Sequence, residues 1–515
     1  MKKKWFMLAM MVCAIGLVSC NDGNEELVEV EQEVDREEEK IPMELKKISF
    51  LAKENPQALI SDIECSIIGD SVIECLIPHI MESKMLIPTF EITGGKMLSN
   101  GEEVISGETV LDCTQPLNIR IEGIDSSLSF VLKVRSFTGL PVVYINTENG
   151  VAITSKDDYV KGNIRIVEDI ETRASGDIFE SAMKIKGRGN STWGLPKKPY
   201  KIKFDEKTSL LGEPADKEWV LLANYTDKTS LRNETAFNMG RMSNLDYTNR
   251  THYVEVILNG VYNGTYQLGE QLKIAKHRVN VGDDGYLLEI DAKAAAEDIT
   301  FRVAHIGQPI NIKDPDVEID SEAYNYVVQY LQETDAALFG ENFTDATNGY
   351  AKYLDVDSFV EWYLINEISK NNDACFFTSC YMNLARDGKL KMGPLWDFDI
   401  AFGNVNYNGC DKPEGFWIKP VAWYARLFQD PSFVQKVKER FAYFYDNREE
   451  IYEEINANAD YLKYSIIENN NKWKTLYVYT WPNNTIWGSY ENEVQSMKIW
   501  LEKRFQWLNE QFALM

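Results

Sequence analysis

A predicted hairpin with its turn at residues 386–389 constrains this chain most strongly, because carboxylates flank it on both sides. The turn, Arg-Asp-Gly-Lys, follows a strand-like run of Tyr, Met and Leu and precedes a second run at 390–396. Asp373 lies before the hairpin, and Asp397 and Asp399 lie after it. Two strands that fold back on each other bring their outer ends to one end of a sheet, so we expect these carboxylates to meet. Phosphotransferases set a catalytic aspartate beside a metal-binding one in this way.

The first 20 residues have the pattern of an export signal. A Met-Lys-Lys-Lys start precedes an almost wholly apolar run, Trp5 to Val18, which is too short for a stable membrane span. Leu17-Val18-Ser19-Cys20 resembles a bacterial lipoprotein processing box, in which the cysteine is acylated and becomes the first residue. We expect Cys20 to anchor the mature chain to a membrane, outside the cytoplasm, at the outer membrane or cell surface. An ordinary secretory signal is the alternative, and it also places the chain outside the cytoplasm.

Residues 21–42 are expected to form an acidic tether. Between Asp22 and Lys40 there are ten acidic residues and two basic ones, a charge run that is usually solvated rather than a site. The whole chain carries a formal charge of −26, which argues against nucleic acid as a partner.

The cysteines and histidines do not predict a metal centre. Outside the signal and Cys20, three cysteines fall in the first folded region and three in the second. These are Cys65, Cys75, Cys113, Cys375, Cys380 and Cys410. Bridges from Cys65 to Cys75 and from Cys375 to Cys380 are conceivable, but neither is required. The cysteine spacings do not fit zinc, and the four histidines are scattered.

Residues 43–137 have the pattern of an all-β sandwich. Short apolar runs recur at sandwich-like intervals, with turn signals such as Asn100-Gly101 between them. The runs start at Ile48, Cys65, Ser71, Leu86, Leu117 and Phe130. No catalytic constellation lies there, which favours a spacer or interaction module, and Gly139-Leu140-Pro141 marks the domain boundary.

Residues 138–515 read as strands first and helices second. Alternating runs begin at Val142, Asn163, Met183, Tyr200, Tyr253 and Gly264, with one helix predicted at 230–242. After residue 320 helices are predicted at 322–338 and 356–368, then from Pro420 to a last one at 491–512. The predicted fold is therefore multidomain, an all-β sandwich followed by an α+β two-lobed domain with the layout of an atypical protein kinase.

Six motifs resemble the kinase family of spore coat protein H (CotH), in the right order over essentially all of 140–515. They are Lys186–Trp193, Lys197–Phe204, Leu221–Lys228, Leu231–Asn233, Gly260–Glu270 and Trp396–Asp399. The family is an atypical, secreted or surface group of kinase-like proteins whose members often carry an N-terminal immunoglobulin-like domain. The resemblance implies transfer of the γ-phosphoryl of ATP to Ser or Thr of an extracytoplasmic protein acceptor, with Mg²⁺ or Mn²⁺, by a monomer.

The resemblance also implies a set of nucleotide-binding residues. The Gly-rich turn with Arg188, Asn190 and Ser191 is able to bring backbone N–H groups and the guanidinium to phosphates. Lys201 and Lys203 alternate on one strand face, and one of them, with Lys203 slightly favoured, is expected to pair with phosphate. Glu234 is the expected ion-pair partner of that lysine, and Glu270 lies where a hinge would offer backbone groups to adenine.

The carboxylates receive separate roles. Asp373 is expected to accept or orient the proton of the acceptor hydroxyl, and Asp397 and Asp399 are expected to bind the metal, because Mg²⁺ takes oxygen ligands. The chain departs from other kinases in having no His-Arg-Asp before the hairpin. It also has Thr378 where an asparagine usually holds a second metal, so Asp399 or Asn383 would have to substitute.

Two readings from other classes stay open at this point. A catalytically inactive kinase-like chain would serve as a surface adhesin or scaffold, although intact Asp373, Asp397 and Asp399 argue against decay. The twelve tryptophans and many tyrosines could instead build a glycan-binding surface. The helical spacing of Trp500 and Trp507 reads more simply as core packing.

Overall fold

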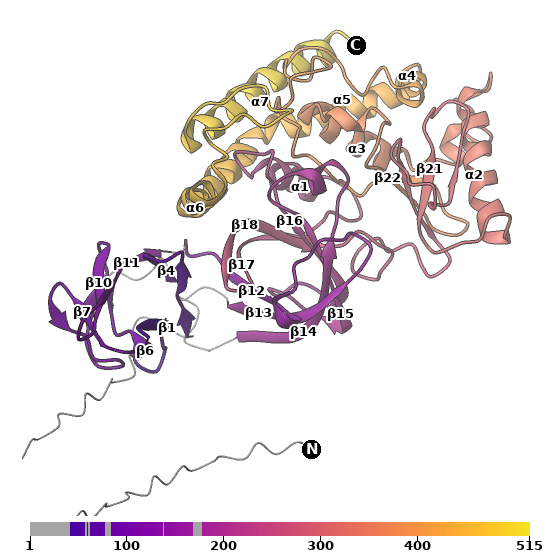
Figure 1. The fold of residues 1–515 in the computed structure, drawn as a ribbon. Helices are drawn as coiled ribbons and strands as arrows, with labels where there is room; N and C mark the ends of the chain where they lie inside the picture. Colours follow the sequence, from indigo (N-terminus) through magenta and orange to yellow (C-terminus); the bar gives the residue numbers. More distant parts are fainter. Residues whose placement is uncertain (1–41, 57–58, 60–61, 78–83, 137, 168–177) are drawn as a thin grey trace, which may run out of the picture. The chain divides into compact units, whose positions relative to one another are not determined.

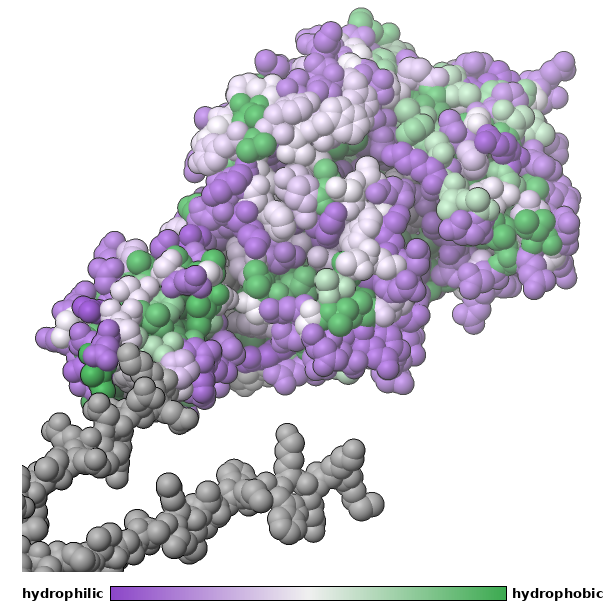
Figure 2. Space-filling view, viewed as in Figure 1, coloured by the Kyte–Doolittle hydropathy of each residue, from purple (hydrophilic) through white to green (hydrophobic). Residues whose placement is uncertain are grey.

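The computed structural model describes residues 42–515 except 57–58, 60–61, 78–83, 137 and 168–177. The chain divides into two compact units, 1–42 and 43–515. The predicted signal peptide, the acidic tether and Cys20 lie outside the described residues. On the face drawn in Figure 2 hydrophilic side chains predominate, and hydrophobic ones gather in small patches.

The region before residue 137 is built of strands, as predicted. A six-stranded sheet has the order β3-β4-β11-β10-β7-β8, a three-stranded sheet the order β2-β1-β6, and β5 pairs with β9. The strands are β1 (Glu44–Phe50), β2 (Ile63–Glu64), β3 (Ser66–Ile68), β4 (Val72–Ile77), β5 (Met85–Leu86), β6 (Thr89–Thr93), β7 (Lys96–Ser99), β8 (Glu102–Glu103), β9 (Leu111–Asp112), β10 (Leu117–Glu122) and β11 (Ser127–Ser136). Side chains such as Ile48 and Phe50 from one sheet and Ile73 and Ile119 from the other pack in one core. Each sheet therefore has one buried apolar face, which accounts for the alternating apolar residues in its strands. The immunoglobulin-like label and the boundary at residue 138 remain predictions.

Seven strands then close into a barrel in the order β12-β13-β14-β15-β16-β18-β17. They are β12 (Val142–Thr147), β13 (Val160–Val167), β14 (Ile178–Gly187), β15 (Tyr200–Thr208), β16 (Asp216–Leu222), β17 (Thr251–Leu258) and β18 (Val261–Glu270). All neighbours are antiparallel except β12 and β17, whose parallel pairing closes the barrel. The alternating residues Ile202, Phe204, Trp219 and Leu221 fill its core, which is the period-2 pattern of the sequence.

Helix α1 (Arg232–Met242) follows the barrel strand β16, close to the predicted span. Asp227 organises its start, because its carboxylate accepts hydrogen bonds from the Thr229 backbone N–H (3.0 Å) and the Arg232 backbone N–H (2.9 Å) and forms a buried ion pair with Arg232. The helix packs against α3 (Val356–Ser369) and α6 (Arg448–Trp473) (Figure 1).

The predicted hairpin is confirmed, but it is part of a larger sheet. β22 (Cys380–Leu384) pairs antiparallel with β23 (Lys391–Met392), and Met382 lies opposite Met392. This hairpin joins a five-stranded sheet of order β20-β21-β19-β22-β23. The other three strands of this sheet are β19 (Tyr286–Ile290), β20 (Thr300–Phe301) and β21 (Ile310–Asp314), and the sequence pattern did not predict them.

Helices make up most of the remaining chain, as predicted. Besides α1, α3 and α6 they are α2 (Glu322–Phe339), α4 (Ala422–Leu427), α5 (Pro431–Asp446) and α7 (Tyr490–Ala513). Short 3-10 turns are η1 (Glu148–Gly150), η3 (Ser191–Gly194), η4 (Tyr350–Lys352) and η5 (Asn372–Ala374). Figure 1 shows α3, α5, α6 and α7 together, with α2 on the opposite side of the five-stranded sheet. Trp500 is buried in the core and Trp507 packs against it, so their spacing does report core packing. Within the described residues, every helix is too short or too polar to cross a bilayer.

The six described cysteines are free thiols, so neither conceivable bridge is present. Cys65, Cys75 and Cys113 are buried in the core of the first region, and burial raises the pKa of Cys113 to about 12. Inert, protonated thiols are what such apolar surroundings produce.

Candidate active site

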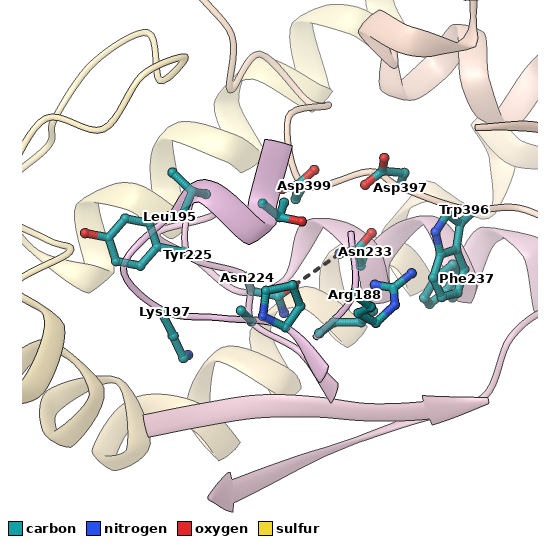
Figure 3. A pocket seen from close by; sticks show the side chains of 14 residues that line it. Arg188, Leu195, Lys197, Asn224, Tyr225, Asn233, Phe237, Trp396, Asp397 and Asp399 are labelled. Atoms are coloured by element: carbon teal, nitrogen blue, oxygen red, sulfur yellow. Dashed lines mark hydrogen bonds between the residues drawn. The ribbon is translucent and has the colours of Figure 1, made fainter. Parts of the chain in front are cut away.

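A cavity of about 880 Å³ gathers the predicted carboxylates. Its walls are the Gly-rich turn around Arg188, the sheet residues Glu289 and Tyr381, and the segments that carry Asp373 and Asp397. A second, small cavity of about 40 Å³ shares Arg188 and Asp397 with it. Figure 3 shows the side chains around this small cavity. The meeting of segments from 188 to 399 in one hollow makes this the candidate active site.

Asp373 lies in the 3-10 turn that follows α3. The helix ends because Lys370 adopts a left-handed conformation, with φ 47°, and the chain then turns so that Asp373 reaches the cavity. Asn372 Nδ2 donates a hydrogen bond of 2.8 Å to Asp373 Oδ1. Burial and, second, the charge of Asp397 raise the pKa of the Asp373 carboxyl.

Asp397 is fixed by its backbone as much as by its side chain. Its φ of 66° places it in the left-handed region, an uncommon conformation for a residue with a side chain. Ser379 Oγ donates to its carboxylate (3.2 Å), and the next backbone N–H, that of Phe398, donates to Asn233 Oδ1 (2.8 Å). The hairpin and helix α1 therefore both position this carboxylate.

Asp399 is held from the segment that follows β16. Thr226 Oγ1 donates to Asp399 Oδ2 at 2.6 Å, and Asn404 Nδ2 donates to the Asp399 carbonyl at 2.8 Å. Burial first, and then the neighbouring charge of Asp397, raises the pKa of the Asp399 carboxyl to about 7.

The donor set fits a divalent cation. The charge of Asp397 contributes to the raised pKa of both Asp373 and Asp399, which is the repulsion that a bound cation relieves. Among the described residues, no three or more His, Cys, Asp or Glu side chains gather closely enough to hold a metal ion by themselves. Mg²⁺ does not need such a cage, because one or two carboxylates plus substrate phosphates and water normally complete its shell. Asp397 and Asp399 are the two carboxylates that would form such a partial site.

Three residues of the Gly-rich turn lie on the cavity wall: Arg188, Asn190 and Ser191. That they bind a nucleotide stays a prediction. Arg188 extends toward Asp397 and Trp396 (Figure 3), with its guanidinium 5.4 Å from the centre of the indole. Burial lowers the pKa of Arg188, and the charge of Asp397 opposes that shift. A cation in this position faces the place where phosphate oxygens would lie beside the carboxylates.

The two predicted phosphate lysines do not line either cavity. They do alternate on one face of β15, but Ile202 and Phe204 fill the barrel interior, so the lysine face is the outer one. There Lys201 forms an ion pair with Glu218 (2.9 Å), and Lys203 is exposed near the Tyr159 ring. The prediction that one of them reaches the phosphates is therefore corrected by the geometry.

Glu234 and Glu270 are also held elsewhere. Glu234 forms an ion pair with Arg241 (2.5 Å) and not with a strand lysine. Glu270 is fully buried and accepts two hydrogen bonds from Arg250, at 2.9 and 2.6 Å. Its backbone N–H donates to the Arg250 carbonyl and its own carbonyl accepts from Asn249, so neither group is open to an adenine. The hinge interpretation is corrected for this residue.

Of the two proposed substitutes for the missing asparagine, only Asp399 reaches the cavity. Asn383 Nδ2 donates to the Gly393 carbonyl (3.0 Å) within the hairpin, away from the lining residues. Thr378 does line the cavity, where its hydroxyl donates to Asp291 Oδ1 at 2.6 Å.

Several residues of the site carry roles that sequence reading did not assign. Asn233 and Asn224 are hydrogen-bonded at 3.2 Å (Figure 3), and Asn224 Nδ2 continues to Gln267 Oε1 at 3.0 Å. Gln267 in turn donates to Glu234 (3.2 Å). Glu234 is therefore connected to the site through the side-chain amides of Gln267, Asn224 and Asn233. The motifs 221–228 and 231–233 contain Asn224, Thr226 and Asn233, and those motifs were the available signal.

Two further groups near the site are charged or titratable. Lys197 is buried, points away from the carboxylates in Figure 3, and donates to the Thr265 carbonyl and to Asn469 Oδ1 (2.9 Å). Burial lowers the pKa of Lys197 to about 7. Glu289 on β19 lines the large cavity, and burial raises its pKa to about 7 despite its ion pair with Lys313 (3.3 Å).

A family model described as CotH kinase protein matches residues 185–508, which include every lining residue of the small cavity. The comparison with curated proteins found no match. One solved structure, of a candidate glycoside hydrolase from Bacteroides thetaiotaomicron VPI-5482, is 14% identical over 35% of this chain and 51% of that chain, with a TM-score of 0.15. A DUF4623 family protein from Bacteroides eggerthii DSM 20697 is 11% identical over 36% of this chain and 58% of that one, also with a TM-score of 0.15. The aligned part thus spans about half the length of these two proteins, and at such TM-scores the likeness does not define a shared fold.

Proposed function

The chain belongs to the CotH kinase protein family, and from this premise we propose that it is an atypical, Mg²⁺- or Mn²⁺-dependent kinase. It transfers the γ-phosphoryl of ATP to Ser or Thr of extracytoplasmic proteins. The observation that carries the proposal is the meeting of Asp373, Asp397 and Asp399 with Arg188 on the wall of one cavity of about 880 Å³. Cavities of this size accommodate small-molecule ligands.

Asp373 is the proposed general base. It accepts the proton of the acceptor hydroxyl while the hydroxyl oxygen attacks the γ-phosphorus, and the bond to the β,γ-bridging oxygen breaks to release ADP. Burial raises its pKa, which makes the carboxylate a better proton acceptor than an exposed aspartate. Asn372 holds one carboxylate oxygen and leaves the other for the acceptor.

Arg188 and the metal-binding pair act on the nucleotide phosphates. Arg188 stabilises negative charge on the transferring phosphoryl, because its guanidinium lies in a partly desolvated wall. Asp397 and Asp399 would hold Mg²⁺, which supplies neutralisation of the phosphate charge when bound. Ser379 and Thr226 keep these two carboxylates in place.

The small cavity supports an adenine position next to the phosphates. Leu195, Leu222, Ala223 and Phe237 give part of its wall an apolar surface, which suits a heterocyclic base, while Asn224 and Asn233 are polar parts of the same wall. Its volume of about 40 Å³ holds roughly one or two waters. Nucleotide binding therefore requires lining side chains of the small cavity to move.

Calorimetric titration with ATP, with and without Mg²⁺, tests the proposal together with transfer from γ-labelled ATP to a serine-rich peptide. Asp397→Asn should lose metal-dependent nucleotide binding. Asp373→Asn should keep it and lose about two to four decades of transfer rate. Asp357→Asn removes an exposed carboxylate outside the cavity and serves as the matched control. A wild-type chain without Mg²⁺-dependent nucleotide binding would overturn the kinase proposal in favour of a surface scaffold.

For localisation we propose a lipoprotein anchored through Cys20, on the strength of the processing-box pattern alone. Cys20→Ser should move the protein out of the membrane fraction and abolish acyl labelling. Unchanged partitioning would refute the anchor without affecting the kinase proposal.

A further inference from the structure

Four exposed aromatic side chains gather in the short segment between α6 and α7. Tyr477, Tyr479, Trp481 and Trp487, here called the aromatic strip, are 63%, 48%, 62% and 49% exposed. Large aromatic side chains are highly buried on average, so four with about half or more of their surface exposed in one short segment are unusual.

The aromatic strip is continuous with the candidate active site. Trp481 and its neighbour Pro482 line the same cavity as Asp373. Tyr407, another lining residue, stacks on Trp481 with ring centroids 5.8 Å apart and planes 15° apart. A molecule that stacks on Trp481 therefore reaches the cavity that Asp373 also lines.

Hydrogen bonds from Lys228 and Asn406, rather than contacts between its own rings, hold the aromatic strip in place. The buried Lys228 donates to the carbonyls of Thr475 (2.5 Å) and Val478 (3.0 Å). Asn406 holds the segment at two points: its backbone N–H donates to the Pro482 carbonyl (3.0 Å), and its amide donates to the Tyr479 hydroxyl (2.7 Å). The Tyr479 ring, which this hydrogen bond fixes, loses little conformational freedom when a ligand binds.

The chemistry of the strip selects a neutral ligand. Residues 475–489 contain no charged side chain, and Asn406, Asn408 and Asn484 supply neutral hydrogen-bonding groups near them in the sequence or the fold. An anionic membrane or nucleic acid would require Lys and Arg here. A second copy of the chain would require a surface of roughly 20 to 30 residues, whereas four rings of a single segment form the strip.

We propose that the aromatic strip binds a neutral oligosaccharide. A pyranose ring presents apolar C–H faces and polar hydroxyl edges, so its faces stack on Trp481 and the tyrosines while its hydroxyls bond to the amides and to the indole and phenol donors. The link to phosphotransfer rests on the proposed function: a glycan held on the strip directs the hydroxyl next to it toward Asp373, so glycan-bearing proteins are the preferred acceptors.

Affinity electrophoresis of the full chain in gels that contain an α-mannan, a β-glucan or a xylan tests the binding. At least one of these neutral polysaccharides should retard the wild type. Trp481→Ala should weaken that binding tenfold or more, and Trp481→Phe, which keeps a ring, should retain most of it. Tyr443→Ala removes an aromatic ring that is 36% exposed on α5 and should bind like the wild type.

The outcomes separate this inference from the kinase proposal, because the binding assay contains no nucleotide. Absence of retardation by all three polysaccharides overturns the inference, as does equal retardation of Trp481→Ala. Retardation only by an anionic polygalacturonate also overturns it. A dimer of the wild type that Trp481→Ala dissociates would assign the strip to a second copy instead. Sugar binding without phosphotransfer would leave the strip assigned and remove only the kinase proposal.

Discussion

The Thr226 hydroxyl donates a hydrogen bond of 2.6 Å to the Asp399 carboxylate, across a separation of 173 residues in the chain. Thr226 is itself fixed, because its carbonyl accepts from Asn404 Nδ2 (3.0 Å) and from Asn483 Nδ2 (2.7 Å). Asn404 also donates to the Asp399 carbonyl. The orientation of a proposed metal ligand thus depends on a threonine that follows β16 and an asparagine that precedes α7.

Thr226→Val should weaken metal-dependent nucleotide binding by about 10- to 100-fold, the range seen when a group that orients a metal ligand is lost. Valine keeps the shape of the side chain but removes the donor to Asp399. Thr226→Ser keeps the hydroxyl and should restore most of the affinity. Calorimetric titration with Mg²⁺ and ATP measures both. Equal losses in the two variants would show that packing, not the hydrogen bond, matters at this position.

Local patterns were sufficient to predict most elements. The alternation of Ile202 and Phe204 with lysines identified β15, and the Arg-Asp-Gly-Lys turn identified the hairpin, because both signals depend only on neighbours in the chain. The joining of β22 to β19 is not visible in this way, since the partner strand lies about 90 residues earlier and carries no local mark of its pairing. Barrel closure by β12 and β17 is non-local for the same reason.

The residues of the candidate site show the same difference between local and non-local sequence signals. Asp373, Asp397 and Asp399 were predictable because the hairpin between them fixes their proximity. Lys203 was a wrong choice because alternation shows that two lysines share a face but not whether that face is the inside or the outside of a barrel. Thr226 was missed because its role arises only when the segment after β16 meets the segment after β23.

The free energy of unfolding should acquire a pH dependence from Lys197. Burial lowers its pKa to about 7 in the folded chain, against roughly 10.4 for an unfolded lysine. Between these values the unfolded chain binds the extra proton, so stability from this group increases as pH rises from 7 to about 10. The difference in unfolding free energy between wild type and Lys197→Met should therefore grow in favour of the wild type, by at most about 1.4 kcal/mol per pH unit.

Urea denaturation at pH 7, 8 and 9 measures this effect. Lys203→Met, a change at an exposed lysine of the neighbouring strand, is the matched control. A difference between wild type and Lys197→Met that stays constant or falls with rising pH contradicts the prediction.

A fragment of residues 138–515 should bind nucleotide like the full chain. The core of the first region draws only on residues up to 134, and every lining residue of the candidate site lies after 155. Thr138 has to be kept, because its hydroxyl donates at 2.7 Å to Glu255, a carboxylate with no exposed surface. A folded fragment with weaker nucleotide binding than the full chain would mean that the first region contributes to the site.

The buried ion pair between Arg504 and Glu367 should be the most costly one to break. Both side chains have no exposed surface, and Arg504 Nη2 lies 2.7 Å from Glu367 Oε1 while its other N–H groups donate to the carbonyls of Pro413 (2.7 Å) and Gly415 (2.8 Å). Arg504→Met leaves a buried carboxylate and several carbonyls without their partner, which should cost about 3–5 kcal/mol of unfolding free energy. Lys436→Met breaks an exposed pair with Asp357 of similar length, 2.6 Å, and should cost at most about 1 kcal/mol. Urea denaturation followed by far-UV circular dichroism compares the two variants, and similar losses in both would show that burial does not set the strength of the α3–α7 connection.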